Sequence, residues 1–248
     1  MKRLFTGQSD TGLVRPVNQD SFYYDPEGRF FIVADGMGGH AGGQEASRIA
    51  ADTIKNYLLE RWDSEDESGA LLEAALLKAN QAILLDQNQH PERSDMGTTV
   101  VVLIFREADL QPWCAHVGDS RLYRLRDPHL EQITEDHTWV ARAMKEGILT
   151  PDQYRVHPWR HVLSQCLGRE DLGQIEIQQF EVQTGDRLLI CSDGLTEELS
   201  DLVIAQNLKG IRACEKAAEE LILAAKKHGG RDNITVVLIS IGSDSNAD

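Results

Sequence analysis

Four aspartates beside strand-like apolar runs constrain this chain more than any other feature of its sequence. Three follow such a run and one precedes it: Asp35, Asp119, Asp193 and Asp232. In antiparallel neighbours the end of one strand adjoins the start of the next, so all four carboxylates can meet at one edge of a sheet. Four separate Asx turns are the alternative, but they leave the dense glycines at residues 36–43 unexplained.

Clustered carboxylates are costly inside a fold unless a cation neutralises them. Oxygen ligands without cysteine are the set that Mg²⁺ and Mn²⁺ prefer. The four aspartates therefore predict a magnesium or manganese site. Two such ions side by side are typical of enzymes that hydrolyse phosphate esters.

The length and charge of the chain narrow the class of protein and its partners. Its 248 residues fit one large domain, which we place at residues 1–241, with residues 242–248 as a disordered tail. A net charge of −15 repels DNA, RNA and anionic lipid, so nucleic-acid and membrane partners are not expected. The sequence has no apolar run of about 18 residues, and its start lacks the apolar stretch of a signal peptide.

The cysteines are far apart and form no Cys-x-x-Cys pair; they are Cys114, Cys166, Cys191 and Cys214. Their spacing argues against zinc and thiol-redox motifs. Unpaired thiols are typical of a reducing compartment, so the expected setting is the cytoplasm. We expect the protein to be a monomer there.

The apolar pattern predicts a mixed α+β chain. Helical spacing of apolar residues indicates helices at about 44–59, 70–86, 196–208 and 214–228. Apolar or alternating runs indicate strands at 30–34, 98–105, 113–117, 121–125, 175–182, 186–191 and 234–241. Strands grouped between two pairs of helices predict two packed sheets, mainly antiparallel, with the helices outside them.

Further candidates lie near the first aspartate. Gly36 opens a glycine cluster where backbone can approach a ligand closely, and its carbonyl oxygen is a candidate metal ligand. His40, in the same cluster, can protonate a leaving alcohol, or it is an ordinary loop histidine. Arg15 can grip a phosphate with two hydrogen bonds, or it is a surface arginine. Asp20 can orient a metal-bound water.

Residues 139–169 interrupt the strands with short helical pieces and two prolines. The segment is basic although the whole chain is acidic. Such a patch attracts a phosphorylated, acidic partner. The alternative is an ordinary surface excursion.

Seven segments resemble the metal-dependent Ser/Thr protein phosphatases of the 2C class, in their compact bacterial form. They appear in the family's order, span residues 9 to 237 and are together highly specific: SDTGLVRPVNQD, VADGMGGHAGG, DMGTTVV, AHVGDSRLYRL, ITEDHTW, CSDGLTEEL and GGRDNITVV. The resemblance implies an α-β-β-α sandwich with metals in a cleft at one edge and a small flap subdomain, about residues 139–169, beside the cleft.

The resemblance also implies roles for the site residues. Asp35 would bridge two ions, with the Gly36 carbonyl oxygen on one ion and Asp193 and Asp232 on the other. Asp119, with help from Asp193, would hold a third ion. Two or three Mg²⁺ or Mn²⁺ ions are therefore expected in each chain.

Three more residues match positions that act on the substrate in this family. Arg15 matches the arginine that grips the phosphate, His40 the proposed general acid, and Asp20 the carboxylate that orients a metal-bound water from outside the metals' own ligands. Asn233, which follows the last aspartate, is expected to support the site.

The expected reaction is hydrolysis of phosphoserine and phosphothreonine in proteins by direct attack of a metal-bridging water, as part of bacterial signal transduction. A metal-dependent phosphodiesterase is one alternative, disfavoured by the net charge of −15. A non-catalytic module that binds a phosphoprotein is another, disfavoured by the complete set of ligands. The segment HPWRHVLSQCLGRED resembles cyanobacterial phosphatases that act on the phosphorylated PII signalling protein, which makes phospho-PII a candidate substrate.

Overall fold

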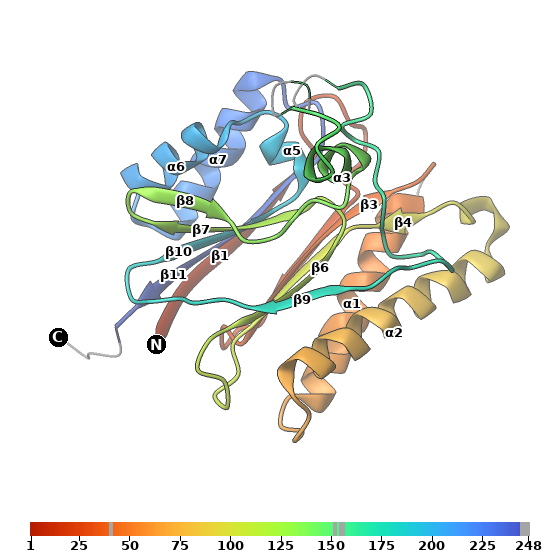
Figure 1. The fold of residues 1–248 in the computed structure, drawn as a ribbon, viewed down its shortest axis with the longest axis horizontal. Helices are drawn as coiled ribbons and strands as arrows, with labels where there is room; N and C mark the ends of the chain where they lie inside the picture. Colours follow the sequence, from red (N-terminus) through yellow and green to blue (C-terminus); the bar gives the residue numbers. More distant parts are fainter. Residues whose placement is uncertain (40–41, 151–152, 154–156, 244–248) are drawn as a thin grey trace.

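Two antiparallel sheets form the middle of the molecule (Figure 1), in a computed structural model that describes residues 1–39, 42–150, 153 and 157–243. Within these residues, one sheet has the strand order β1 (Lys2–Asp10), β11 (Ile234–Gly242), β10 (Arg187–Cys191), β7 (Arg121–Arg126) and β8 (His129–Gln132). The other has the order β2 (Asp20–Tyr24), β3 (Phe30–Met37), β5 (Val100–Ile104), β6 (Trp113–Val117) and β9 (Glu176–Gln179), and β4 (Gly97–Thr98) pairs with the end of β3.

Helices cover the outer face of each sheet. The long helices α1 (Gly42–Arg61) and α2 (Ser68–Gln89) lie on the β3 sheet, and α6 (Asp201–Gly210) and α7 (Cys214–His228) lie on the β11 sheet (Figure 1). Shorter helices are α3 (Trp139–Lys145), α5 (Asp193–Thr196) and a 3₁₀ turn at Pro91–Arg93. This layering confirms the expected α-β-β-α sandwich.

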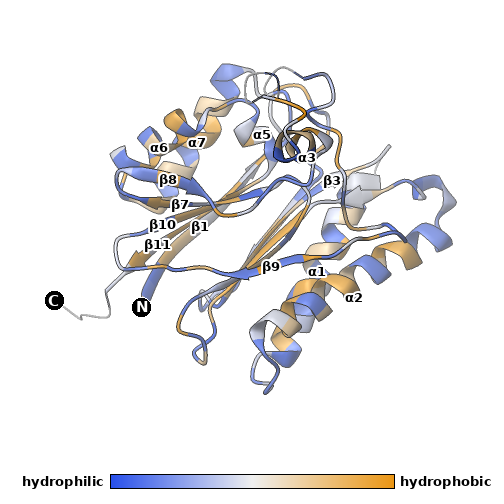
Figure 2. Ribbon diagram, viewed as in Figure 1, coloured by the Kyte–Doolittle hydropathy of each residue, from blue (hydrophilic) through white to orange (hydrophobic). Residues whose placement is uncertain are grey.

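Strand β3 shows why the central strands are continuously apolar. Phe30 and Ile32 contact the core under α1 and α2, whereas Phe31 and Val33 belong to the core between the two sheets. Successive side chains of a strand point to opposite faces, and here both faces are covered, so neither face is polar. Burying each such side chain contributes roughly 1.5–3 kcal/mol. The strands at two sheet edges are different: Figure 2 shows that β8 and β9 are mainly hydrophilic.

The structure corrects several boundaries predicted from the sequence. The helix expected at about 196–208 is two helices, α5 and α6. The strand expected over 98–105 is divided into β4 and β5, and the one expected over 175–182 shortens to β9. Strand β11 includes Gly242, which the sequence had placed in the tail, and residues 244–248 of that expected tail lie outside the described residues. In the described part of the chain, no helix is long and apolar enough to cross a membrane.

Candidate metal centre

The four predicted aspartates line one cleft of about 940 Å³. Asp35 comes from the end of β3, and Asp119 from the turn that follows β6. Asp193 is the first residue of α5, just after β10, and Asp232 lies just before β11. The two sheets thus bring their carboxylates together at one edge of the sandwich. Gly36 lines the same cleft.

Mutual repulsion and burial disfavour the ionised forms of these carboxyls. Burial, and then the charges of Asp20 and Asp193, raise the pKa of Asp35 well above its usual range. The pKa of Asp119 is also raised well above its usual range, by burial and by Asp193. Burial and the charges of Glu197 and Asp232 raise the pKa of Asp193 to about 7. A set of crowded, electron-rich oxygens of this kind fits divalent cations, which would remove the repulsion.

Two threonine hydroxyls, in residues 98 and 99, connect the end of β3 that carries Asp35 with the turn that carries Asp119. The Thr99 hydroxyl accepts a hydrogen bond from the Asp35 N–H at 3.1 Å and shares another with the Ser120 hydroxyl at 2.7 Å. The Thr98 hydroxyl donates to the Asp35 carbonyl oxygen at 2.8 Å. The threonines therefore fix the backbone of Asp35 relative to the residue that follows Asp119.

Asp20 begins β2, lies behind the cleft and is hydrogen-bonded across to the sheet that contains β10 and β11. Its Oδ2 accepts hydrogen bonds from the hydroxyls of Ser192 at 2.8 Å and Thr235 at 2.6 Å. Its Oδ1 is buried and has no hydrogen-bond donor within the described residues. Burial raises the pKa of Asp20 to about 6. A buried, unsatisfied carboxylate oxygen beside Asp35 fits the orientation of a water on a neighbouring cation.

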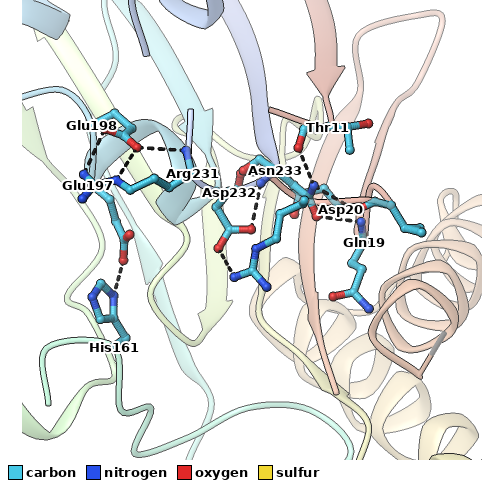
Figure 3. A network of polar contacts seen from close by, with 12 residues as sticks. Thr11, Gln19, Asp20, His161, Glu197, Glu198, Arg231, Asp232 and Asn233 are labelled. Atoms are coloured by element: carbon cyan, nitrogen blue, oxygen red, sulfur yellow. Dashed lines mark hydrogen bonds and ion pairs between the residues drawn. The ribbon is translucent and has the colours of Figure 1, made fainter. Parts of the chain in front are cut away.

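The loop that carries Arg15 is held on the start of β11 by Asn233 (Figure 3). The Asn233 side chain donates to the carbonyl oxygens of Thr11 and Val17, both at 3.0 Å, and accepts from the Gln19 N–H at 2.8 Å. Arg15 Nη2 lies 2.6 Å from Asp232 Oδ2, and the Arg15 side chain is 51% exposed. The guanidinium is therefore at the mouth of the carboxylate cluster.

Gly36 has no room for a side chain. A Cβ atom there would lie 1.9 Å from the Gly43 carbonyl oxygen and 2.6 Å from that of Gln19. The start of α1 and the Gln19 backbone therefore approach the cleft at this point because residue 36 is glycine. His40, the candidate general acid, lies outside the described residues.

The sequence did not single out Glu197 as a site residue. Its carboxylate contacts the His161 ring at Nδ1 (Figure 3). Possible ligand atoms of His161, Asp193 and Glu197 lie within 4.8 Å of one another. One signal was present in the sequence: Glu197 is four residues after Asp193, a spacing that brings two side chains together when the segment is helical, and helix α5 begins at Asp193 rather than at the expected residue 196. The contact with His161, from the segment expected to be a flap, had no such signal.

Comparisons with known proteins agree with the geometry. The family model described as Protein phosphatase 2C matches residues 14–225. The chain is 37% identical over 241 residues to the serine/threonine protein phosphatase PstP of Mycobacterium tuberculosis, covering 96% of this chain and 45% of PstP. It therefore spans about half the length of that relative. It is 35% identical to the serine/threonine phosphatase stp of Listeria monocytogenes, covering 94% of this chain and 93% of stp.

Solved structures show the same fold. A crystal structure of M. tuberculosis PstP superposes with a TM-score of 0.88 at 36% identity, covering 97% of this chain and 99% of that one. The catalytic domain of PstP in complex with two manganese ions superposes with a TM-score of 0.83 at 36% identity, with the same coverage.

Proposed function

Because this chain belongs to the protein phosphatase 2C family, we propose that it hydrolyses phosphoserine and phosphothreonine in proteins and depends on Mg²⁺ or Mn²⁺. The observation that carries the proposal is the gathering of Asp35, Asp119, Asp193 and Asp232 in one cleft. The names of the relatives from M. tuberculosis and L. monocytogenes, both serine/threonine phosphatases, support it. Their bacterial origin supports a role in bacterial signal transduction.

We assign the metal ligands as the sequence suggested: Asp35, the Gly36 carbonyl oxygen, Asp119, Asp193 and Asp232, for two or three ions. When bound, such ions supply a water that ionises near neutral pH and neutralise the charge of the phosphate.

Side chains outside that ligand set would act on the water and the substrate. Asp20, fixed by Ser192 and Thr235, would accept a hydrogen bond from the water through Oδ1 and aim its lone pair at phosphorus. Arg15 would exchange its bond with Asp232 for two bonds to phosphate oxygens, since cations relieve Asp232 of its need for a partner. His40 would donate the proton that the departing serine or threonine oxygen takes up.

Residues 160–173 supply much of the cleft's other wall, including Arg160, His161 and Arg169. Exposed apolar side chains adjoin the rim, Val14 next to Arg15 and Trp159 next to Arg160. A rim of cations and apolar groups suits the polypeptide around a phosphorylated residue better than a small ester alone. We keep phospho-PII as the specific candidate substrate, on the resemblance of residues 157–171. We further propose that the protein acts as a monomer in the cytoplasm, where free cysteines such as these four are usual.

A chelator-controlled assay of the purified protein tests the proposed function. We expect Mn²⁺-dependent release of phosphate from phosphoserine and phosphothreonine peptides and from phospho-PII, and no release with excess chelator. An aryl phosphate monoester should also be hydrolysed, and the corresponding diester should react far more slowly. Faster cleavage of the diester would favour a phosphodiesterase, and binding of phosphopeptide without turnover would favour a non-catalytic module.

Arg15→Lys should lower kcat/KM for a phosphopeptide by roughly 10- to 100-fold. Lysine keeps the charge but cannot make two parallel hydrogen bonds to a phosphate, and one charged hydrogen bond contributes about 1.5–3 kcal/mol. Steady-state kinetics at saturating Mn²⁺ measure the effect. The matched control is Arg231→Lys, because Arg231 also lines the cleft but is paired with Glu198. Equal losses in the two variants would contradict the role of Arg15.

His40→Ala should slow hydrolysis of phosphopeptides by about 10²-fold or more, the usual range for lost general-acid help. It should have little effect on an activated aryl phosphate, whose leaving group departs without a proton. The ratio of the two rates, compared with that of the unsubstituted protein, is the measurement. A uniform loss on both substrates would argue against proton donation by His40.

A further inference from the structure

Both backbone polar groups of Gly118, the residue before Asp119, bind the same histidine. The Gly118 N–H donates to His137 Nδ1 at 3.1 Å, and the His137 N–H donates to the Gly118 carbonyl oxygen at 2.9 Å. Gly118 has φ of +105°, and a Cβ there would lie 2.5 Å from Thr99 Cβ. The turn that carries Asp119 is therefore held between Thr99 on one side and His137 on the other.

A second link joins the same two segments. Arg121, two residues after Asp119, donates to both oxygens of Asp136, at 2.8 and 2.6 Å. Asp136 is the residue before His137, so the pair of residues Asp136 and His137 binds both ends of the turn. Bidentate pairs of this kind fix geometry as well as charge.

The surroundings of His137 fix which ring nitrogen accepts. Since Nδ1 accepts from Gly118, the neutral ring carries its proton on Nε2, and Nε2 faces Glu176 Oε1 at 3.5 Å. His116 stacks on the His137 ring with centroids 4.6 Å apart, and it is the cross-strand neighbour of Glu176. A carboxylate behind the ring thus favours the tautomer that Gly118 needs.

A metal site is the competing reading of these side chains, because possible ligand atoms of His116, His137 and Glu176 lie within 4.8 Å of one another. The hydrogen bonds argue against it. His116 Nε2 lies 2.8 Å from the Glu135 carbonyl oxygen, which can only accept, so this nitrogen also carries its proton. Neither Nε2 atom then offers a lone pair to a cation. The one ring lone pair left is on His116 Nδ1, which is buried and has no hydrogen-bond partner within the described residues, and one nitrogen with one carboxylate is too few ligands for a closed metal site.

We propose that His137 is a positioning residue that holds the Asp119 carboxylate in place for cation binding, with Glu176 setting its tautomer. This inference rests on the proposed function for the role of Asp119. The same residue also anchors one wall of the cleft, because its carbonyl oxygen accepts from the Ser164 N–H at 2.8 Å. The Asp119 turn and the segment around Ser164 are therefore attached to one another through His137.

The test compares a variant that loses the acceptor with one that keeps it. His137→Leu removes Nδ1, whereas His137→Asn places an amide oxygen near the same position. The Mn²⁺ concentration for half-maximal hydrolysis of an aryl phosphate should rise by about tenfold or more in His137→Leu, since such supporting residues typically change metal affinity 10- to 100-fold. It should stay within about threefold in His137→Asn. His129→Leu is the control, because His129 is exposed on β8.

Two readouts do not depend on activity. Titration calorimetry with Mn²⁺ should show a weakened site only in His137→Leu, and the Gly118 amide should exchange with deuterium faster in that variant than in His137→Asn. If His137→Leu does not fold, Glu176→Gln serves instead. In that variant ¹⁵N spectra should show part of the neutral His137 rings with the proton on Nδ1 in place of Nε2. An unchanged Mn²⁺ isotherm and unchanged Gly118 exchange would overturn the proposal. An inactive but Mn²⁺-binding protein would instead overturn the proposed function.

Discussion

Asp35→Asn is expected to abolish turnover and, at the same time, to stabilise the metal-free protein. Asp35 is the residue whose carboxyl is opposed by the charges of four neighbouring aspartates. Turnover should fall by about 10³-fold, the upper end of the loss on removing a single preorganised charge-stabilising group, because Asp35 would be a ligand of more than one ion. In the absence of metal, asparagine keeps the shape and needs neither a buried charge nor the uptake of a proton on folding, so the melting temperature in chelator should rise.

Phosphopeptide assays and thermal unfolding, each with Mn²⁺ and with chelator, measure the two effects. The gain in melting temperature on adding Mn²⁺ should be smaller in Asp35→Asn, because a ligand that binds more weakly to the folded state stabilises it less. Asp52→Asn is the matched control, since Asp52 is exposed on α1 and does not line the cleft of the four aspartates. A variant that kept activity, or that was less stable than the unsubstituted protein in chelator, would contradict the proposed role of Asp35.

Among the strands, the sequence predicted most clearly those that have apolar residues on both faces. Strands β3, β5 and β10 are nearly all buried, and their runs stand out from any neighbouring residues. The bounds of strand β1 were not predicted, because most of its side chains are exposed or half-buried and its pairing with β11 is a tertiary contact. The break between α5 and α6 was missed although Ser200 and Asp201 form an ordinary helix start.

The residues of the site also fall into a group that the sequence predicted and a group that it did not. Each predicted aspartate sits beside a strand that periodicity identifies, so topology alone brings the carboxylates to one edge. The contacts of Glu197 and His137 depend on where the irregular segments 135–138 and 160–165 lie in the folded chain, and irregular segments have no periodicity from which to infer this. Sequence could indicate the carboxylates but not the groups that hold them.

The metal-free protein should lose stability as pH rises from about 4 to about 7. The pKa of Asp20 is raised to about 6 and that of Asp193 to about 7. Between the unfolded value near 4 and these folded values, the folded state binds protons that the unfolded state has released. Stability from these groups is complete below about pH 4 and is lost as pH rises through the folded pKa values. The free energy of unfolding should therefore fall by on the order of a few kcal/mol across this range.

Carboxyls in ion pairs elsewhere in the protein make the free energy of unfolding rise with pH, but only at lower pH. Ion pairs lower the pKa of Asp25 and Glu198, so their contribution is lost only as pH falls below about 4. Divalent cations keep the cluster ionised, so the difference in melting temperature between Mn²⁺-loaded and chelated protein should widen from pH 5 to pH 8. Asp193→Asn should flatten the chelated curve over this range, because it removes one of the groups that take up a proton on folding. A chelated protein whose stability rose across pH 5 to 8 would show that these carboxyls do not crowd one another, and the case for a cation between them would lose its physical basis.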